Sequence, residues 1–540
     1  MTAPRPPSHM FDPITLEVLR NALEATAQEM GGVLKLTSFS PNIKERMDAS
    51  CAIFDAKAQL IAQAEHVPIH LGSMLKAVGP TIAAVGELEP GDVVIVNDPF
   101  IGGAHLPDIT LVAPAHAGGA LVGYVATRAH HSDVGGMEPG SMPGKSNEIF
   151  QEGLVIPPVR LYRAGELQVD VMRLIMANVR TAAERRGDLN AQLAAIRIGE
   201  RRLGELAGRY GTRVLSEGFA AILDYAERRM RNRIAELPPG TYFAEDCLDD
   251  DGSSDEPVLV KLRVDVAPDK LTLDFEGSSP QRRGNINAVA PMTHSAVFFA
   301  VKVLTDATIP ANAGILRPVE IKIPPGSFLD AQRPAAVCAG NTETSQRVSD
   351  TVLKAFAQLA PARIPAASQG TMNLIAVGGV DPRSGRSYTY IETIAGGQGG
   401  RPGGDGMDGV QCNMTNTMNT PVEALEISYP MRVERYEIRE GSGGSGRNRG
   451  GHGVVRSLTV VGHDARVSLQ SDRRRFRPYG LHGGLEGTPG RNWVRDKSDS
   501  VRELPGKVSL TLRDGDTVCV ETPGGGGWGP ETGKPGPAGR

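Results

Sequence analysis

The chain has 540 residues, of which 40% are hydrophobic and 22% charged, so it can bury several cores and is not disordered as a whole. Its net charge of −4 includes no basic block, and its few aromatic residues are not interleaved with Lys and Arg, which argues against nucleic acid and favours a small-molecule substrate. The 5 scattered cysteines predict a reducing, cytoplasmic location, and no apolar run approaches the roughly 18 residues of a membrane span.

Helical and strand signals alternate in the N-terminal part of the chain. Asp12 and Pro13 have the residue types of a helix cap and first turn, and an apolar stripe starts at Ile14. A second amphipathic segment is predicted over residues 74–85. Short β-rich runs follow at residues 93–96, 109–113 and 121–127. We therefore expect residues 11–170 to form a mixed α/β region.

The rest of the chain predicts three further regions. Residues 171–238 are rich in Ala, Leu, Arg and Glu and predict a helical hairpin. Residues 239–391 mix strand and helix patterns, and residues 392–529 are Gly-rich with short strands. The predicted fold class is therefore a multidomain α+β protein, with disordered tails at residues 1–10 and 530–540.

Several polar or glycine-rich segments each have more than one interpretation. Glycine clusters at residues 396–409, 441–453 and 524–529 are typical of flexible linkers, or of tight turns beside a pocket. Asn341–Ser345 either lines a substrate pocket or forms a turn. The basic cluster Arg473–Arg475 is compatible with a phosphate contact, although a solvated loop or a subunit contact is the more frequent case.

Two polar loops flank the predicted strands around residues 109–127. His105 and Asp108 close the first loop, and His130 and His131 open the second. These loops converge if the strands form a hairpin, which makes His105, Asp108 and His130 candidate ligands of one metal ion. Imidazole with carboxylate suits Zn²⁺, Mn²⁺ or Fe²⁺ and usually leaves a position open for water or substrate, so the pattern indicates catalysis.

The alternative is that these histidines cap turns and bond to the backbone, as most isolated histidines do. Other ionisable side chains that are candidates for completing a metal shell are Asp48, Glu148, Glu152, His66 and His70. The spacing of His66 and His70 matches one helix face, but Pro68 between them argues against a regular helix. Packing around the pocket is therefore preferred to ligation for this pair.

Short motifs are spread in order along the chain. The N-terminal ones are Lys44–Asp48, Cys51–Asp55, His66–Gly72 and Asn97–Thr110. The downstream ones are Gly284–Asn287, Thr415–Glu423, Arg449–Gly451 and Thr522–Gly527. Together they resemble the hydantoinase B/oxoprolinase family over nearly the whole chain.

The resemblance implies a partner and a metal. Family members pair with a hydantoinase A-like subunit of the actin-like ATPase fold, which binds ATP and Mg, so an α2β2 heterotetramer is expected. In agreement, this chain contains no Walker A sequence. Matching the family motifs residue by residue implies a divalent metal (Zn, Mn or Fe) on His105, Asp108 and His130, with Asp48 as a fourth contact.

The implied reaction is ATP-dependent opening of a cyclic amide such as a hydantoin, oxoproline or lactam. The partner would phosphorylate the substrate oxygen and the metal would activate water, with His131 or Glu148 as acid or base. A subunit of an ATP-dependent ketone carboxylase of the acetone or acetophenone type is the alternative, placed second because those subunits tend to be longer or to have an additional small subunit. A non-catalytic scaffold, whose His and Asp side chains only cap loops, is the third hypothesis.

Overall fold

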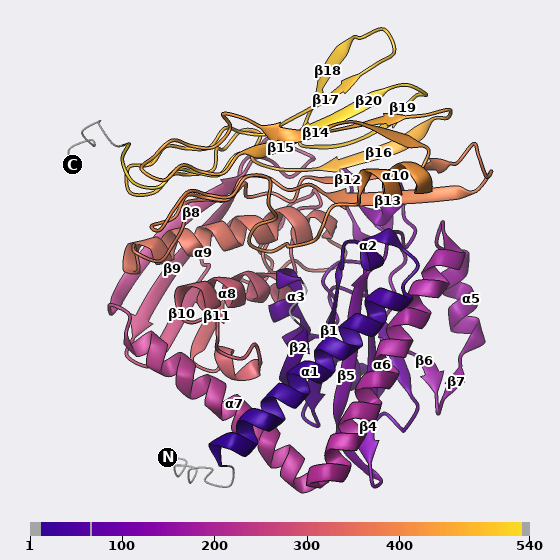
Figure 1. The fold of residues 1–540 in the computed structure, drawn as a ribbon, viewed down its shortest axis with the longest axis vertical. Helices are drawn as coiled ribbons and strands as arrows, with labels where there is room; N and C mark the ends of the chain where they lie inside the picture. The colour runs from indigo at the N-terminus through magenta and orange to yellow at the C-terminus, as the bar shows by residue number, and fades with distance from the viewer. Residues whose placement is uncertain (1–11, 65–66, 532–540) are drawn as a thin grey trace.

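The computed structural model describes residues 12–64 and 67–531, in which helices surround and connect four β-sheets (Figure 1). His66 and the tails predicted at residues 1–10 and 530–540 lie outside these ranges, apart from the first two residues of the second tail. The helices are α1 (Pro13–Thr37), α2 (Pro41–Lys44), α3 (Pro68–Ser73), α4 (Val78–Val85), α5 (Val169–Ala177), α6 (Ala182–Tyr210), α7 (Thr212–Ala235), α8 (Ala290–Leu304), α9 (Ser345–Leu359) and α10 (Val422–Ser428).

The first two sheets follow one another along the chain, whereas the strands of the two C-terminal sheets alternate within the last part of it. The N-terminal sheet has 7 strands in the order β2 (Leu60–Ala64), β1 (Ala49–Asp55), β5 (Ala120–His130), β4 (Asp108–Ala117), β3 (Val93–Val96), β6 (Val159–Arg163) and β7 (Glu166–Leu167). The next has 4 strands in the order β11 (Val319–Lys322), β10 (Lys270–Asp274), β9 (Val258–Ala267) and β8 (Gly240–Leu248). The C-terminal sheets have the orders β13 (Ser387–Thr393), β12 (Leu374–Val380), β16 (Ala465–Gln470), β19 (Lys507–Leu512), and β14 (Met431–Arg439), β15 (Gly453–Val460), β20 (Thr517–Glu521), β17 (Arg491–Arg495), β18 (Val501–Leu504).

The 7-stranded sheet is covered on both faces. Helices α1 and α6 lie side by side across one face (Figure 1), where Leu23 and Ile196 join Leu111 in one apolar core. On the other face, Met74 and Val112 belong to a second apolar core. Coverage on both faces explains why the central strands are almost continuously buried rather than alternating between buried and exposed residues.

The N-terminal predictions agree with this structure. Asp12 caps α1, its side chain accepting hydrogen bonds from the backbone N–H groups of Ile14 and Thr15 at 3.0 Å. Strands β4 and β5 pair antiparallel, which confirms the predicted hairpin. The predicted helical region contains α5, α6 and α7, and α6 ends at Gly211, whose φ of 83° favours glycine. Multiple sheets with interspersed helices confirm the predicted α+β fold class.

No helix among residues 12–64 and 67–531 is both long and apolar enough to cross a membrane.

The C-terminal glycine clusters pack against one another, contrary to both interpretations of the sequence. Gly400 N–H donates to the carbonyl oxygen of Gly526 at 2.8 Å, and Gly444 N–H donates to that of Gly525 at 2.8 Å. A Cβ atom on Gly450 would lie 1.9 Å from the Gly525 oxygen. The absence of side chains therefore allows backbone segments from distant parts of the chain to touch. The glycines serve this tertiary packing and form neither a flexible linker nor a turn beside the pocket.

Glycine also sets the distance between α3 and α8. A Cβ atom on Gly72 would lie 2.5 Å from the backbone N and Cα of Ser295. We expect Gly72→Ala to destabilise the protein by about 1–3 kcal/mol, because two helix backbones must separate. Gly204→Ala in α6 is the matched control, since nothing lies within 4 Å of its added Cβ, and it should be neutral or slightly stabilising. Thermal unfolding midpoints measure both; equal midpoints for the two variants would contradict the expected clash.

Candidate metal centre

The β4–β5 ladder brings a carboxylate and an imidazole together. Asp108, the first residue of β4, pairs in register with His130, the last residue of β5. Residues directly opposite in an antiparallel pair present their side chains on the same face of the sheet. His105 lies in the turn before β4, where its carbonyl oxygen accepts a hydrogen bond from Asp108 N–H at 3.0 Å. One ligand atom from each of the three buried side chains lies within 4.8 Å of the others.

The carboxylate of Asp108 is a buried charge without a hydrogen bond. Neither oxygen has a hydrogen-bond partner, although His105 Nε2 lies 3.3 Å from Oδ1 and His70 Nε2 lies 3.6 Å from Oδ2. Burial raises the pKa of Asp108, but His105 and His70 outweigh this effect and hold the pKa well below its usual range. A charge in the core without partners is costly, so the three side chains fit a divalent cation that would neutralise it.

His130 has the charge state of a metal ligand. Burial lowers its pKa to about 4, so the ring is neutral at pH 7, as coordination requires. Asn42 fixes its position, because the Asn42 amide nitrogen donates to the His130 carbonyl oxygen at 2.8 Å and lies 3.2 Å from ring Nδ1.

His70 lies behind Asp108, away from the pocket wall. It is 1% exposed, and its Nδ1 lies 2.9 Å from the Ser50 hydroxyl while Nε2 faces the Asp108 carboxylate. The sequence argument against one regular helix through both histidines agrees with the structure, because α3 begins only at Pro68 and Val67 before it is extended. The preference for packing over ligation is compatible with this placement, since a contact with Asp108 holds that carboxylate in one orientation.

Of the remaining predicted site residues, Asp48 lies at the pocket, whereas His131 and Glu148 do not. Asp48 lines the pocket beside His130 but is not one of the three clustered side chains. His131 points away from the pocket and lies 2.9 Å from the Gln192 side chain, because consecutive residues alternate across a strand. Glu148 is exposed and caps the short helix that begins at the next residue. The structure therefore does not bring the side chains of His131 and Glu148 to the pocket.

The carboxylate of Glu152 is also occupied by hydrogen bonds within the protein. It is fully buried, and its carboxylate accepts hydrogen bonds from the Ser146 hydroxyl at 2.8 Å and from the backbone N–H groups of Val337 and Cys338 at 3.0 and 3.1 Å. This carboxylate anchors a loop and is not available to a metal.

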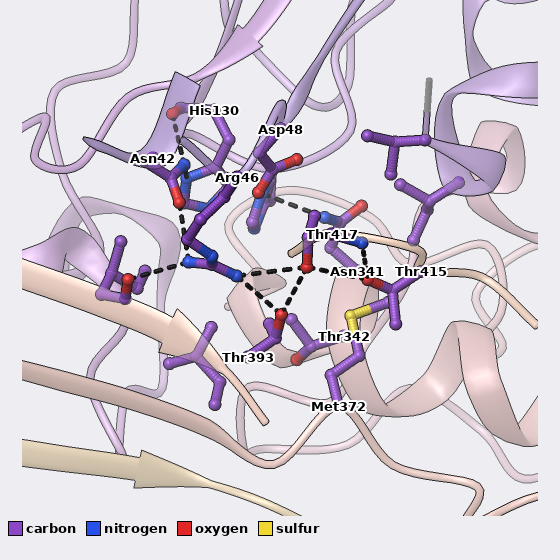
Figure 2. Close-up of a pocket in the computed structure, with 15 residues that line it drawn as sticks. Asn42, Arg46, Asp48, His130, Asn341, Thr342, Met372, Thr393, Thr415 and Thr417 are labelled. Atoms are coloured by element: carbon purple, nitrogen blue, oxygen red, sulfur yellow. Dashed lines mark hydrogen bonds between the residues drawn. The ribbon is translucent and has the colours of Figure 1, made fainter. Parts of the chain in front are cut away.

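His105 and His130 line a small pocket built from distant parts of the chain, and the Asp108 carboxylate lies next to them, outside the pocket lining (Figure 2). Its lining residues are Asn42, Arg46, Asp48, Val67, Ile69, His105, His130, Asn341, Thr342, Met372, Leu374, Ile391, Thr393, Thr415 and Thr417. The cavity has a volume of about 20 Å³, room for about one water molecule, so a ring-sized ligand enters only when the walls move apart. Asn341 and Thr342 lie in this wall, which favours the pocket interpretation of their motif over the turn.

Arg46 joins the N-terminal and C-terminal walls of the pocket (Figure 2). Its guanidinium donates to Asn42 Oδ1 at 2.8 Å, to Thr393 Oγ1 at 2.7 Å and to Thr417 Oγ1 at 3.3 Å. It also donates to the carbonyl oxygens of Ile391 and Met418. The sequence analysis missed Arg46 as a pocket residue; the only signal was its place in the Lys44–Asp48 motif.

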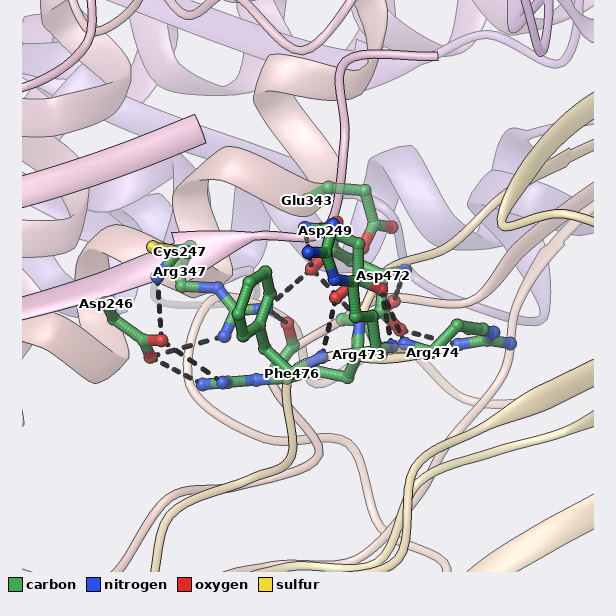
Figure 3. Close-up of polar contacts among 12 residues, drawn as sticks. Asp246, Cys247, Asp249, Glu343, Arg347, Asp472, Arg473, Arg474 and Phe476 are labelled. Carbon is green, nitrogen blue, oxygen red and sulfur yellow. Dashed lines mark hydrogen bonds and ion pairs between the residues drawn. The ribbon is translucent and has the colours of Figure 1, made fainter. Parts of the chain in front are cut away.

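A buried ion network lies behind the pocket wall (Figure 3). Arg347 of α9 is fully buried and pairs with Asp472 at 2.7 Å and Asp246 at 3.2 Å, and Arg473 pairs with Asp246 at 2.8 Å. Arg474 donates to the Asn373 side chain. The sequence interpretation of Arg473–Arg475 as a phosphate contact, solvated loop or subunit contact is therefore wrong for the first two arginines. Arg473 also pairs with Asp350 of α9 at 3.1 Å, and Arg474 also donates to the Asn492 side chain at 2.7 Å.

Removing Arg347 tests this network. Arg347→Met leaves the buried carboxylate of Asp472 short of a partner, so we expect a loss of about 3–5 kcal/mol in the free energy of unfolding. Arg263→Met is the control, because Arg263 is 47% exposed in its pairs with Asp265 and Asp274 and should change stability by less than about 1 kcal/mol. Chemical denaturation of both variants measures the difference; a small effect at Arg347 would contradict a structural role for the network.

The fold and the site define a multidomain α+β protein with a buried His–Asp centre suited to a divalent metal. A family model described as Hydantoinase B/oxoprolinase matches residues 12–531, and the chain belongs to this family.

Individual relatives agree with the family. The chain is 39% identical to 5-oxoprolinase of Saccharomyces cerevisiae over 551 residues, covering 96% of this chain and 42% of the yeast protein, so it spans about two-fifths of that relative's length. It is 32% identical over 539 residues to a protein of a Pseudomonas species named as one of the subunits of a D-/L-hydantoinase, covering 96% of this chain and 90% of that protein.

Two solved structures share the fold. The ATP-dependent caprolactamase from Pseudomonas jessenii superposes with a TM-score of 0.90 at 31% identity, covering 97% of this chain and 92% of that chain. Acetone carboxylase superposes with a TM-score of 0.89 over 96% of this chain and 76% of its own, but at 18% identity this likeness shows the fold alone.

Proposed function

We propose that this chain is the metal-binding catalytic subunit of an ATP-dependent cyclic amide hydrolase. The observation that carries the proposal is the buried cluster of His105, Asp108 and His130, whose carboxylate lacks a hydrogen-bond partner. The names of its relatives support the reaction class, because they refer to enzymes acting on 5-oxoproline, hydantoins and caprolactam. The substrate class is accordingly a cyclic amide.

His105, Asp108 and His130 would hold the ion, and Asp48 is the further contact that the family motif suggests. A Zn, Mn or Fe ion at this place would supply a Lewis acid that lowers the pKa of water and stabilises negative charge on the reacting group. Asp48 is also the carboxylate among the pocket-lining residues. It therefore replaces His131 and Glu148 as our candidate for accepting a proton.

The protein residues around the cluster prepare it for this chemistry. His70 and Asn42 hold Asp108 and His130 in place, and apolar side chains such as Val67 and Leu374 exclude water from the pocket. A dry site strengthens every electrostatic interaction within it.

The ATP-dependent step is assigned to a separate polypeptide. The sequence has no Walker A motif, and the Pseudomonas relative is named as one part of a larger enzyme. We propose a hydantoinase A-like partner that binds ATP and Mg, in an α2β2 assembly. The longer yeast 5-oxoprolinase, of which this chain matches 42%, is compatible with both functions in one polypeptide.

The two other hypotheses receive less support. A scaffold that uses His and Asp only to cap loops would satisfy their polar atoms, yet both Asp108 oxygens and His105 Nδ1 lack partners. A ketone carboxylase rests on likeness of fold alone. Incorporation of labelled bicarbonate into product by the purified pair would identify the carboxylase.

Replacing the clustered residues tests the proposal. We expect His105→Ala and Asp108→Asn to abolish stoichiometric metal and ring opening, because each removes a donor from the ion, while nucleotide binding by the partner persists. His116→Ala, at the far end of the same hairpin, is the control. Metal analysis of the purified chain and assays of the pair with ATP and 5-oxoproline, hydantoin or caprolactam measure the outcome. Retention of metal and activity in both variants would refute the proposal.

His70 provides a separate prediction. Because it orients the Asp108 carboxylate without lining the pocket, His70→Ala should weaken metal binding by about 10- to 100-fold and leave the fold intact. His463→Ala is the control, since this histidine contacts Tyr388 at a distant surface. Competition with a chelator measures the affinities; an unchanged affinity would show that Asp108 is held without His70.

A further inference from the structure

Asn341 presents a side-chain amide to the candidate metal centre from a different part of the fold. It lies in a π-helix, Gly340–Thr344, that directly precedes α9. Such turns are rare and occur frequently at functional sites. The residue is 6% exposed and lines the pocket (Figure 2). A Cβ atom on Gly340 would lie 1.9 Å from the Asn287 carbonyl oxygen. The backbone of the π-helix is therefore packed closely against the segment at Asn287.

The nitrogen of the Asn341 side-chain amide has one hydrogen-bond partner, and its oxygen has none. Its Nδ2 lies 3.0 Å from His105 Nε2, the ring nitrogen that also faces Asp108 Oδ1 at 3.3 Å. Its Oδ1 is buried and has no hydrogen-bond partner. A single lone pair on His105 Nε2 cannot serve both a hydrogen-bond donor and a metal ion. With the ion in place, the Asn341 N–H group loses its acceptor and needs another.

Four other polar side chains of the pocket are already engaged with one another or with the backbone. Arg46 donates to five acceptors, and Asn42 accepts from Arg46 and donates to a backbone oxygen. The hydroxyls of Thr393 and Thr417 lie 2.9 Å apart and both contact Arg46. Asn341 therefore combines an unpartnered acceptor with a donor that metal binding releases.

We propose that Asn341 is a substrate-contacting residue that donates its Nδ2 hydrogen bond to the reacting amide group of the ring. The acceptor is the ring nitrogen, because the substrate oxygen carries the phosphate that the partner transfers. When water adds to the amide carbon and the C–N bond breaks, the electron pair of that bond goes to this nitrogen. A fixed amide donor suits this role because it needs no change of charge and is held in place before the substrate arrives. This inference rests on the proposed function, and it adds a recognition residue from α9's side of the pocket to the histidines of the β4–β5 hairpin.

Two variants of similar size separate this role from metal ligation. Asn341→Leu removes the donor, and Asn341→Asp replaces it with a charged acceptor. For both we expect metal affinity equal to or tighter than that of the wild type, because the competing hydrogen bond to His105 is gone. The kcat of ring opening should fall by roughly 100-fold or more, the size of effect expected on loss of one fixed donor to charge that develops in the transition state. Asn21→Leu, on the exposed side of α1, is the matched control with wild-type kcat.

Chelator competition on the full chain and steady-state assays of the chain with its partner, ATP and 5-oxoproline, hydantoin or caprolactam provide the two readouts. Loss of metal from Asn341→Leu would overturn the inference and make Asn341 a ligand through Oδ1. Wild-type kcat in metal-loaded Asn341→Leu would also overturn it and leave the proposed function standing. If the wild-type pair binds metal but opens no cyclic amide, the proposed function fails first, and the role of Asn341 fails with it.

Discussion

The register of β4 against β5 is the constraint on which the site depends. It places Asp108 opposite His130 on one face of the sheet, inside a core from which water is excluded. A one-residue slip would turn one of these side chains to the opposite face. Because the strands are covered on both faces by helices, the carboxylate is left charged and without a hydrogen bond, and a cation is the natural partner for it.

The C-terminal half of the chain completes this site from outside. Threonines at positions 393, 415 and 417 and the π-helix close the pocket that the hairpin opens. Arg46 connects the two halves through hydrogen bonds to both. The buried pairs of Arg347 and Arg473, together with the packed glycine segments, hold the C-terminal sheets in position behind that wall. The position of the C-terminal wall of the pocket therefore depends on packing and ion pairs that lie outside the pocket.

A site assembled in this way is small in the described conformation, with room for about one water molecule beside the charged cluster. A ring that the partner has activated would therefore reach it only after the walls move apart. The proposed division of work between an ATP-binding partner and this chain is compatible with this arrangement, in which a candidate metal centre borders the pocket. Asn341 extends the arrangement from metal binding to recognition of the substrate.

The sequence by itself determined the local elements and the principal residues of the site. The Asp12–Pro13 cap, the apolar stripes and the hairpin signal depend on near neighbours, and the spacing of His105, Asp108 and His130 around one hairpin is local as well. Only the tertiary structure decided which of the other polar residues join them. His131 faces away because the strand alternates, Glu148 caps a surface helix, and the basic cluster at residues 473–475 is partly buried in ion pairs. The contact of Asn341 with His105 joins residues 236 positions apart, and that of Arg46 with Thr393 joins residues 347 positions apart. The glycine clusters also touch segments far away in the sequence, and no local sequence pattern specifies such contacts.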